Sequence, residues 1–270
     1  MVAGTRIYQQ RRLAGDALAQ FEVGLRRSAS IAIEPDAHDL VSWAQRFLPV
    51  PVPLPPCALH RWLSAELSRS VEQRGLRLAV TAPRGTAKST WSSILFVLWC
   101  VCHHAEPFIL IASESAEQAQ GFLSAVKWEL ENNRALAAEY PEACGIGRVW
   151  THKQIVTVNG IRIRAGGATG RIRGLREREH RPTLVVVDDP EGDLASYSEP
   201  LREKVWNWFT RTLEKIGGPD TNYIVIGTMI HEECLLAKLS IQTGWRAKKF
   251  ASVIRWPDRM ELWDEWERKL

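Results

Sequence analysis

Short apolar segments alternate with longer segments of helical periodicity through the middle of this chain. Four of the short segments, each of five or six residues, are predicted strands: 76–81, 108–112, 183–188 and 223–227. Strands that are apolar on both faces are typical of parallel sheets covered by crossover helices. The alternation therefore predicts an α/β fold with a mainly parallel central sheet flanked by helices.

Helices are predicted in the intervals, where apolar residues recur at helical spacing, over 59–74, 88–102, 116–132, 199–216 and 232–240. Gly217 and Gly218 follow the fourth helix as a C-cap signal. Residues 154–158 and 161–165 alternate in character around Asn159-Gly160. This pattern predicts a β-hairpin inserted between the second and third parallel strands.

Composition shifts divide the chain into three parts. Residues 1–48 are mixed and partly helical in pattern, and five prolines within residues 49–56 form a stiff connector. We predict a helical N-terminal segment with its Pro-rich linker over 1–56, an α/β core over 57–250 and a C-terminal tail over 251–270.

The composition also limits the class of protein. Hydrophobic residues make up 45% of the chain and charged residues 24%, which is ordinary for a globular protein. The five cysteines are scattered and do not suggest the disulfide framework of a secreted protein. The N-terminus lacks the apolar stretch of a signal peptide, and the longest apolar run, 91–102, is shorter than the roughly 20 residues that span a bilayer. We expect a cytosolic protein with no membrane partner.

Positive charge is concentrated in one segment. The chain carries a formal net charge of +4, whereas residues 161–181 alone contain seven arginines and two glutamates. Such a local excess favours contact with a polyanion. The alternative is a solvated loop in which Glu177 and Glu179 pair with neighbouring arginines.

Residues 78–90 run from a strand through a small-residue turn into an apolar helix, as a phosphate-binding loop does. Backbone N–H groups at such a helix start can surround phosphate oxygens, Lys88 can reach the outer phosphates and the Ser89 hydroxyl can bind Mg²⁺. Alanines, Ala82 and Ala87, occupy both glycine positions of the usual pattern. Gly85 is then the residue expected to supply backbone freedom. An ordinary strand-to-helix turn with a solvated lysine is the alternative.

A second acidic motif supports the phosphate-loop interpretation. The apolar strand 183–188 ends in Asp188 and is followed by Asp189. Open α/β sheets place ligand groups at the ends of such strands, and these acids can organise a metal and polarise a water. A turn with a helix cap would explain the same acids. Together with Lys88 and Ser89 they predict a site for ATP and Mg²⁺.

These residues resemble the large terminase subunit of tailed bacteriophages, the ATPase that drives genome packaging. The resemblance extends over about residues 60–263. It rests on the order and spacing of three segments: 82–90, 170–176 together with 181–189, and 226–232. It implies a P-loop NTPase fold.

The resemblance assigns a role to each matching position. It implies that Arg84, Gly85, Thr86, Ala87, Lys88, Ser89 and Thr90 contact the nucleotide, with Arg84 sensing the γ-phosphate. Ser89 and Asp188 would hold the metal, and Asp189 takes the place of a catalytic glutamate. Thr228 falls in the coupling motif, with an ordinary strand-end threonine as the competing explanation. His60 falls where related motors contact adenine, although a helix cap or a packing role is the alternative.

Four arginines precede the second acidic motif, where the family places an arginine that acts on the neighbouring subunit. These are Arg171, Arg173, Arg176 and Arg178, of which we favour Arg176 or Arg178 for that role. Contact of several of them with DNA phosphates is the alternative.

The function implied by the resemblance is an ATPase motor that moves double-stranded DNA into a procapsid. It implies a homo-oligomeric ring on a portal protein, a small terminase subunit as partner, and the cytoplasm of an infected bacterial host. Full terminases add a ribonuclease-H-like nuclease domain; because the sequence ends at Leu270, we expect no nuclease activity. Two rivals stay open: a phosphotransferase, such as a nucleotide or small-molecule kinase, and a non-hydrolysing nucleotide-binding assembly module.

Overall fold

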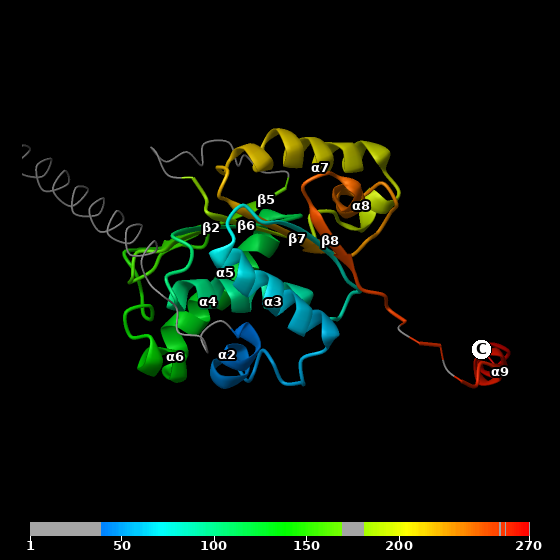
Figure 1. Ribbon diagram of the computed structural model, residues 1–270, viewed down its shortest axis with the longest axis horizontal. Helices are drawn as coiled ribbons and strands as arrows, with labels where there is room; N and C mark the ends of the chain where they lie inside the picture. Colours follow the sequence, from blue (N-terminus) through cyan, green and yellow to red (C-terminus); the bar gives the residue numbers. More distant parts are fainter. Residues whose placement is uncertain (1–38, 169–180, 254, 257, 270) are drawn as a thin grey trace, which may run out of the picture.

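The computed structural model describes residues 39–168, 181–253, 255–256 and 258–269 (Figure 1). Most of the N-terminal segment predicted to be helical, 1–38, lies outside these residues. Its described end forms a helix, α2 (Leu40–Phe47), which packs against the next helix, α3 (Ala58–Glu72). The Pro-rich residues 49–56 connect the two helices.

A single eight-stranded sheet forms the centre of an α/β fold, in the order β3-β4-β5-β2-β6-β7-β1-β8. The six strands from β5 to β8 in this order run parallel, and β3 and β4 pair antiparallel at one edge. The strand bounds are β1 Arg77–Thr81, β2 Phe108–Ser113, β3 Val149–Trp150, β4 Gln154–Val156, β5 Arg162–Gly167, β6 Leu184–Asp188, β7 Asn222–Gly227 and β8 Arg246–Lys249. All four predicted parallel strands are confirmed.

The predicted hairpin is also confirmed, because β4 and β5 pair antiparallel. It is not a separate insertion, however. All of β5 pairs in parallel with β2, so the hairpin extends the central sheet. The outer strand β8 was not predicted, because its four residues are exposed and include three basic side chains instead of an apolar run.

Helices cover both faces of the sheet (Figure 1). On one face lie α2, α3, α4 (Phe96–Cys102), α5 (Ala116–Asn132) and α6 (Arg134–Glu139); on the other lie α7 (Glu199–Arg211) and α8 (Leu235–Ile241). Alternate residues of β2 accordingly belong to two hydrophobic clusters: Ile109 and Ile111 to the first, Leu110 and Ala112 to the second. None of the described helices has both the length and the apolar sequence needed to cross a membrane.

Two predicted helices differ in detail from the structure, and the short helix predicted over 232–240 begins only at Leu235. The helix 88–102 contains a π-helical segment, Thr90–Leu95, before α4. The helix predicted over 199–216 ends at Arg211, and a 3-10 turn follows over Leu213–Lys215. Neither Gly217 nor Gly218 has the positive φ of a helix cap, so that prediction was wrong. Gly217 instead leaves room for its neighbours, because a Cβ there would lie 2.5 Å from Thr221 Oγ1.

In the tail, α9 (Glu261–Glu267) has no buried residue.

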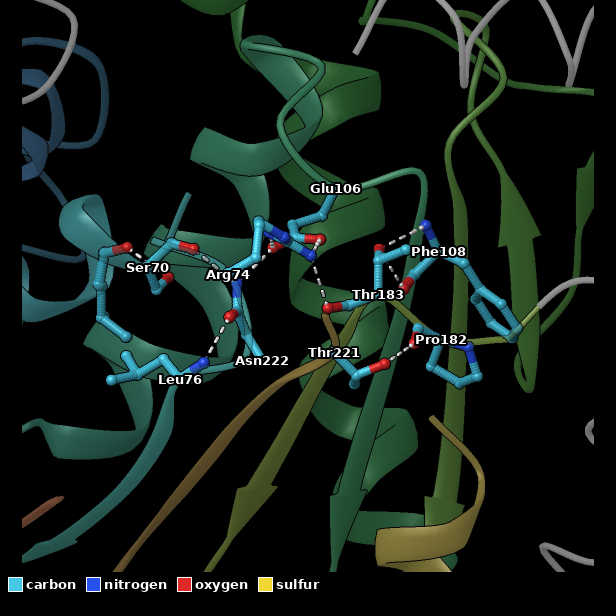
Figure 2. A network of polar contacts seen from close by, with 10 residues as sticks. Ser70, Arg74, Leu76, Glu106, Phe108, Pro182, Thr183, Thr221 and Asn222 are labelled. Carbon is cyan, nitrogen blue, oxygen red and sulfur yellow. Dashed lines mark hydrogen bonds and ion pairs between the residues drawn. The ribbon is translucent and has the colours of Figure 1, made fainter. Parts of the chain in front are cut away.

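A buried polar network ties together the amino ends of the parallel strands (Figure 2). Arg74, which follows α3, donates to both carboxylate oxygens of Glu106 at 2.5 and 3.0 Å, and also to the Thr183 carbonyl at 3.0 Å. Asn222 donates to Glu106 at 3.0 Å and to the Ser70 carbonyl at 2.7 Å. Glu106 is fully buried, and burial raises its pKa although hydrogen bonds from Arg74 oppose the rise.

Removal of Arg74 should therefore destabilise the fold strongly. Arg74→Ala leaves the Glu106 carboxylate buried without its cation, which typically costs about 3–5 kcal/mol in free energy of unfolding. The loss should be smaller at pH 5 than at pH 8, because the uncompensated carboxyl then binds a proton in the folded state. Urea unfolding at both pH values measures this, with the exposed α3 residue changed in Arg61→Ala as control. The double variant Arg74→Ala/Glu106→Gln should recover part of the loss; a double variant no more stable than Arg74→Ala would contradict the account.

Candidate functional site

A polar pocket of about 320 Å³ lies at the carboxyl ends of the parallel strands. It brings together five residues predicted for the site: Arg84, Gly85, Lys88, Asp189 and Thr228. The other lining residues are Glu114, Gln118, Glu191, Gly192, Asp193 and Ile230. Strands β1, β6 and β7 end here, because β7 lies between β1 and β6 in the sheet. Segments about a hundred residues apart in sequence therefore meet at one edge.

The loop between β1 and the following helix adopts left-handed backbone conformations at two residues. Gly85 has φ +75, which confirms it as the position that needs conformational freedom. Ala87 has φ +54, which an alanine adopts only at a cost of about 1–2 kcal/mol. Ala87 therefore has the left-handed conformation that favours glycine, at a position where the usual phosphate-loop pattern has glycine.

His60 braces this loop from α3. Its Nδ1 accepts the Cys57 N–H at 3.2 Å, which assigns the proton to Nε2; this atom then donates to the Thr86 carbonyl at 2.7 Å. The ring stacks on Trp91, with centroids 5.0 Å apart. Of the predicted site residues that the structure describes, six do not line the pocket: His60, Thr86, Ala87, Ser89, Thr90 and Asp188. The adenine contact of His60 stays a prediction.

Lys88 is only 5% exposed, and its Nζ lies 3.0 Å from Asp189 Oδ2. Burial of an ammonium group is unfavourable unless a partner carries the opposite charge, and Asp189 provides it. The second carboxylate oxygen of Asp189 accepts the Thr228 N–H at 2.8 Å. Asp189 itself has φ +39, a left-handed conformation that turns the chain at the end of β6. It thus links the loop lysine to the end of β7.

Asp188 is fully buried and lies beside this ion pair in sequence. It accepts hydrogen bonds from Ser89 Oγ at 2.8 Å and Ser93 Oγ at 2.7 Å. Burial raises its pKa from 3.8 to about 6, although both serine hydroxyls oppose the rise. Ser93 was not predicted from the sequence. It follows Ser89 by four residues, so the two hydroxyls lie on the same face of the helix, and this spacing could have indicated it.

The residues present fit a magnesium ion bound together with phosphate. Mg²⁺ in nucleotide sites takes one or two carboxylates or hydroxyls from the protein and its other ligands from phosphate and water. The neighbouring Ser89 hydroxyl and Asp188 carboxylate supply that set. Among the described residues there is no group of three or more His, Cys, Asp or Glu side chains with metal-binding geometry. A magnesium site in which phosphate and water supply most of the ligands does not need such a group of side chains.

Acidic residues that sequence reasoning missed form the rim of the pocket. Asp193, in the 3-10 turn Asp193–Ser196, makes an ion pair with Arg84. Glu191 accepts the Leu235 N–H at 2.8 Å, and burial raises its pKa. Glu114 directly follows β2, so the pattern that predicted Asp188, an acid at the end of an apolar strand, could also have predicted Glu114.

Two predicted features need separate mention. Thr228 Oγ1 is buried and has no hydrogen-bond partner among the described residues, although the residue lines the pocket. A buried hydroxyl without a partner favours a missing ligand. The four arginines of the predicted trans-acting group, Arg171, Arg173, Arg176 and Arg178, lie outside the described residues.

Comparisons with known proteins do not assign a family to this chain. No model of a known protein family matches the sequence. No curated protein matches it significantly either.

Asp188→Asn should change how stability depends on pH. In the folded chain the Asp188 carboxyl binds its proton more tightly than in the unfolded chain, so its contribution to stability is fully present below pH 3.8 and is lost as pH rises through about 6. From pH 5 to pH 8 the loss is about 1–2 kcal/mol. The asparagine variant keeps hydrogen-bonding groups for both serines but cannot ionise, so its stability relative to wild type should rise by that amount.

Urea unfolding without Mg²⁺ or nucleotide measures this difference. Asp220→Asn, at an exposed turn, is the matched control and should show no such pH-dependent gain. A constant difference in free energy of unfolding between wild type and Asp188→Asn from pH 5 to pH 8 would contradict the inference that burial disfavours the ionised form of Asp188.

Proposed function

We propose that this chain is a P-loop ATPase, the motor module of a viral terminase large subunit, which hydrolyses ATP with Mg²⁺ to move double-stranded DNA into a procapsid. One observation carries the proposal. A buried ammonium, a hydroxyl and two carboxylates converge at the carboxyl edge of the sheet, with Lys88 3.0 Å from Asp189 and Ser89 2.8 Å from Asp188.

The proposed binding step is an exchange of partners. Backbone N–H groups at the start of the helix that begins at Lys88 face the loop, where phosphate oxygens are favourable. Lys88 would leave Asp189 for the outer phosphate oxygens, and the unpartnered Thr228 hydroxyl would donate to them. Ser89 and Asp188 would hold Mg²⁺, which when bound neutralises phosphate charge.

Asp189 supports a motor rather than a simple binding site. It touches Lys88 with one oxygen and the Thr228 N–H with the other. When Lys88 turns to phosphate, Asp189 loses one of its two partners. Its remaining partner is the Thr228 N–H, so a movement of Asp189 would be transmitted to the chain that follows β7. The state of the nucleotide would thereby alter the region between β7 and α8.

Charge supports a polyanionic partner and a shared site. The pocket is lined by two basic side chains, Arg84 and Lys88, and by four acidic ones, so it needs additional positive charge to hold a triphosphate. Mg²⁺ would supply part of it. We propose that Arg176 or Arg178 supplies the rest from the neighbouring subunit of a ring on a portal protein, and that Arg171 and Arg173 contact DNA phosphates. The proposed partner is the small terminase subunit, and the proposed location is the cytoplasm of an infected bacterial host.

Lys88→Ala should abolish ATP hydrolysis, a loss of at least about 10²-fold in kcat, because the variant lacks the ammonium that stabilises charge on the outer phosphates. Phosphate release from ATP, with and without double-stranded DNA, measures this. Lys204→Ala, at an exposed position on α7, is the matched control and should behave as wild type.

The products separate the rival functions. DNA-stimulated release of inorganic phosphate supports the motor. Transfer of the labelled phosphoryl group to a small acceptor would indicate a phosphotransferase, and ATP binding without turnover in the presence of DNA would indicate an assembly module. Equal turnover by Lys88→Ala and wild type would remove the phosphate-loop assignment.

A further inference from the structure

Two carboxylates in the pocket compete for the role of general base, and the geometry separates them. Both oxygens of Asp189 are engaged, one by the Thr228 N–H at 2.8 Å and the other by Lys88 Nζ at 3.0 Å. The Thr228 N–H still holds one of these oxygens at the end of β7 when Lys88 turns to phosphate. Asp189 therefore serves as the link between the loop and β7.

Glu114 lines the same pocket and is differently placed. Strand β2 pairs in parallel with β6, with Ser113 in register with Asp188. The next residue, Glu114, consequently lies beside Asp189, and its N–H donates to the Asp189 carbonyl at 3.3 Å. Within residues 39–168 and 181–253 no group donates a hydrogen bond to the Glu114 carboxylate, which is exposed in the pocket.

The absence of a side chain at residue 192 gives the Glu114 carboxylate its place. A Cβ on Gly192 would lie 1.9 Å from Glu114 Oε1, so any larger residue there would push the carboxylate aside. Gly192 has φ −82, which any residue can adopt. A Cβ at residue 192 would thus act through the space that the carboxylate occupies, not through the backbone conformation, and the exposed Glu114 side chain would have to move.

We propose that Glu114 is the catalytic base of this pocket, accepting a proton from the water that attacks the γ-phosphate. This inference rests on the proposed function. The water oxygen forms a bond to the γ-phosphorus as the bond from that phosphorus to the β–γ bridging oxygen breaks, and the electron pair leaves with ADP. Glu114 takes one water proton and later releases it to phosphate or solvent. Gln118, in the first turn of α5, lines the pocket beside it and orients the water through its amide.

Glu114→Gln tests the proposal, since it keeps size and polarity but removes the proton acceptor. Its kcat for ATP hydrolysis should fall by about 10²-fold or more. The dissociation constant for ATP and the midpoint of thermal unfolding should stay close to wild type, because the carboxylate is exposed and holds no partner in the described fold. Glu117→Gln, three residues later in the first turn of α5 and outside the pocket, is the matched control and should retain wild-type turnover.

A second variant tests the placement of the carboxylate. Gly192→Ala leaves Glu114 in the chain but displaces its side chain, so kcat should fall while ATP remains bound. Wild-type kcat in Glu114→Gln would overturn the proposal, above all if Asp189→Asn lost turnover and still bound ATP. A wild-type chain that neither binds nor hydrolyses ATP would instead overturn the proposed function, and this inference with it.

Discussion

The ion pair between Lys88 and Asp189 depends on the order of the strands. An ammonium group that is 5% exposed needs a carboxylate at hydrogen-bond distance, and the partner comes from the end of β6, two strands away from β1. Strand β7 fills the interval, and its end is connected to the pair through the Thr228 N–H. Any change in what Lys88 contacts therefore alters the interactions at the ends of all three strands, which is what the proposed motor requires.

Local sequence patterns were enough to predict four parallel strands, the hairpin and the residues of the loop, because apolar runs and small-residue turns act within a few residues; β3 and β8 were not predicted. They could not predict which strands are neighbours. Glu114 and Asp189 became adjacent only through the pairing of β2 with β6, a contact between segments 75 residues apart. The strand β8 was missed because its exposed basic residues carry no apolar signal, and Ser93 because its role depends on where Asp188 points.

The places where local rules fail are concentrated at the pocket. Ala87 and Asp189 both have positive φ, and a π-helical segment begins two residues after Lys88. Each of these conformations is unfavourable for its residue and persists only because the surrounding contacts hold it. Outside the pocket, His104 is the one other non-glycine residue with positive φ in the described part of the chain. Strain of this kind is characteristic of sites at which a ligand supplies part of the compensation.

The two ends of the sheet handle buried carboxylates in opposite ways. At the amino ends, Glu106 has a guanidinium and an amide directed at its oxygens, so the charge is matched whatever the pocket contains. At the carboxyl ends, Asp188 has only two serine hydroxyls, and its pKa of about 6 records an ionised state that the fold does not fully stabilise. A cation bound at Asp188, as proposed, would stabilise its ionised form, whereas Glu106 already has a guanidinium at hydrogen-bond distance. The first arrangement is complete without a ligand, and the second fits the cation that is proposed for the opposite edge of the sheet.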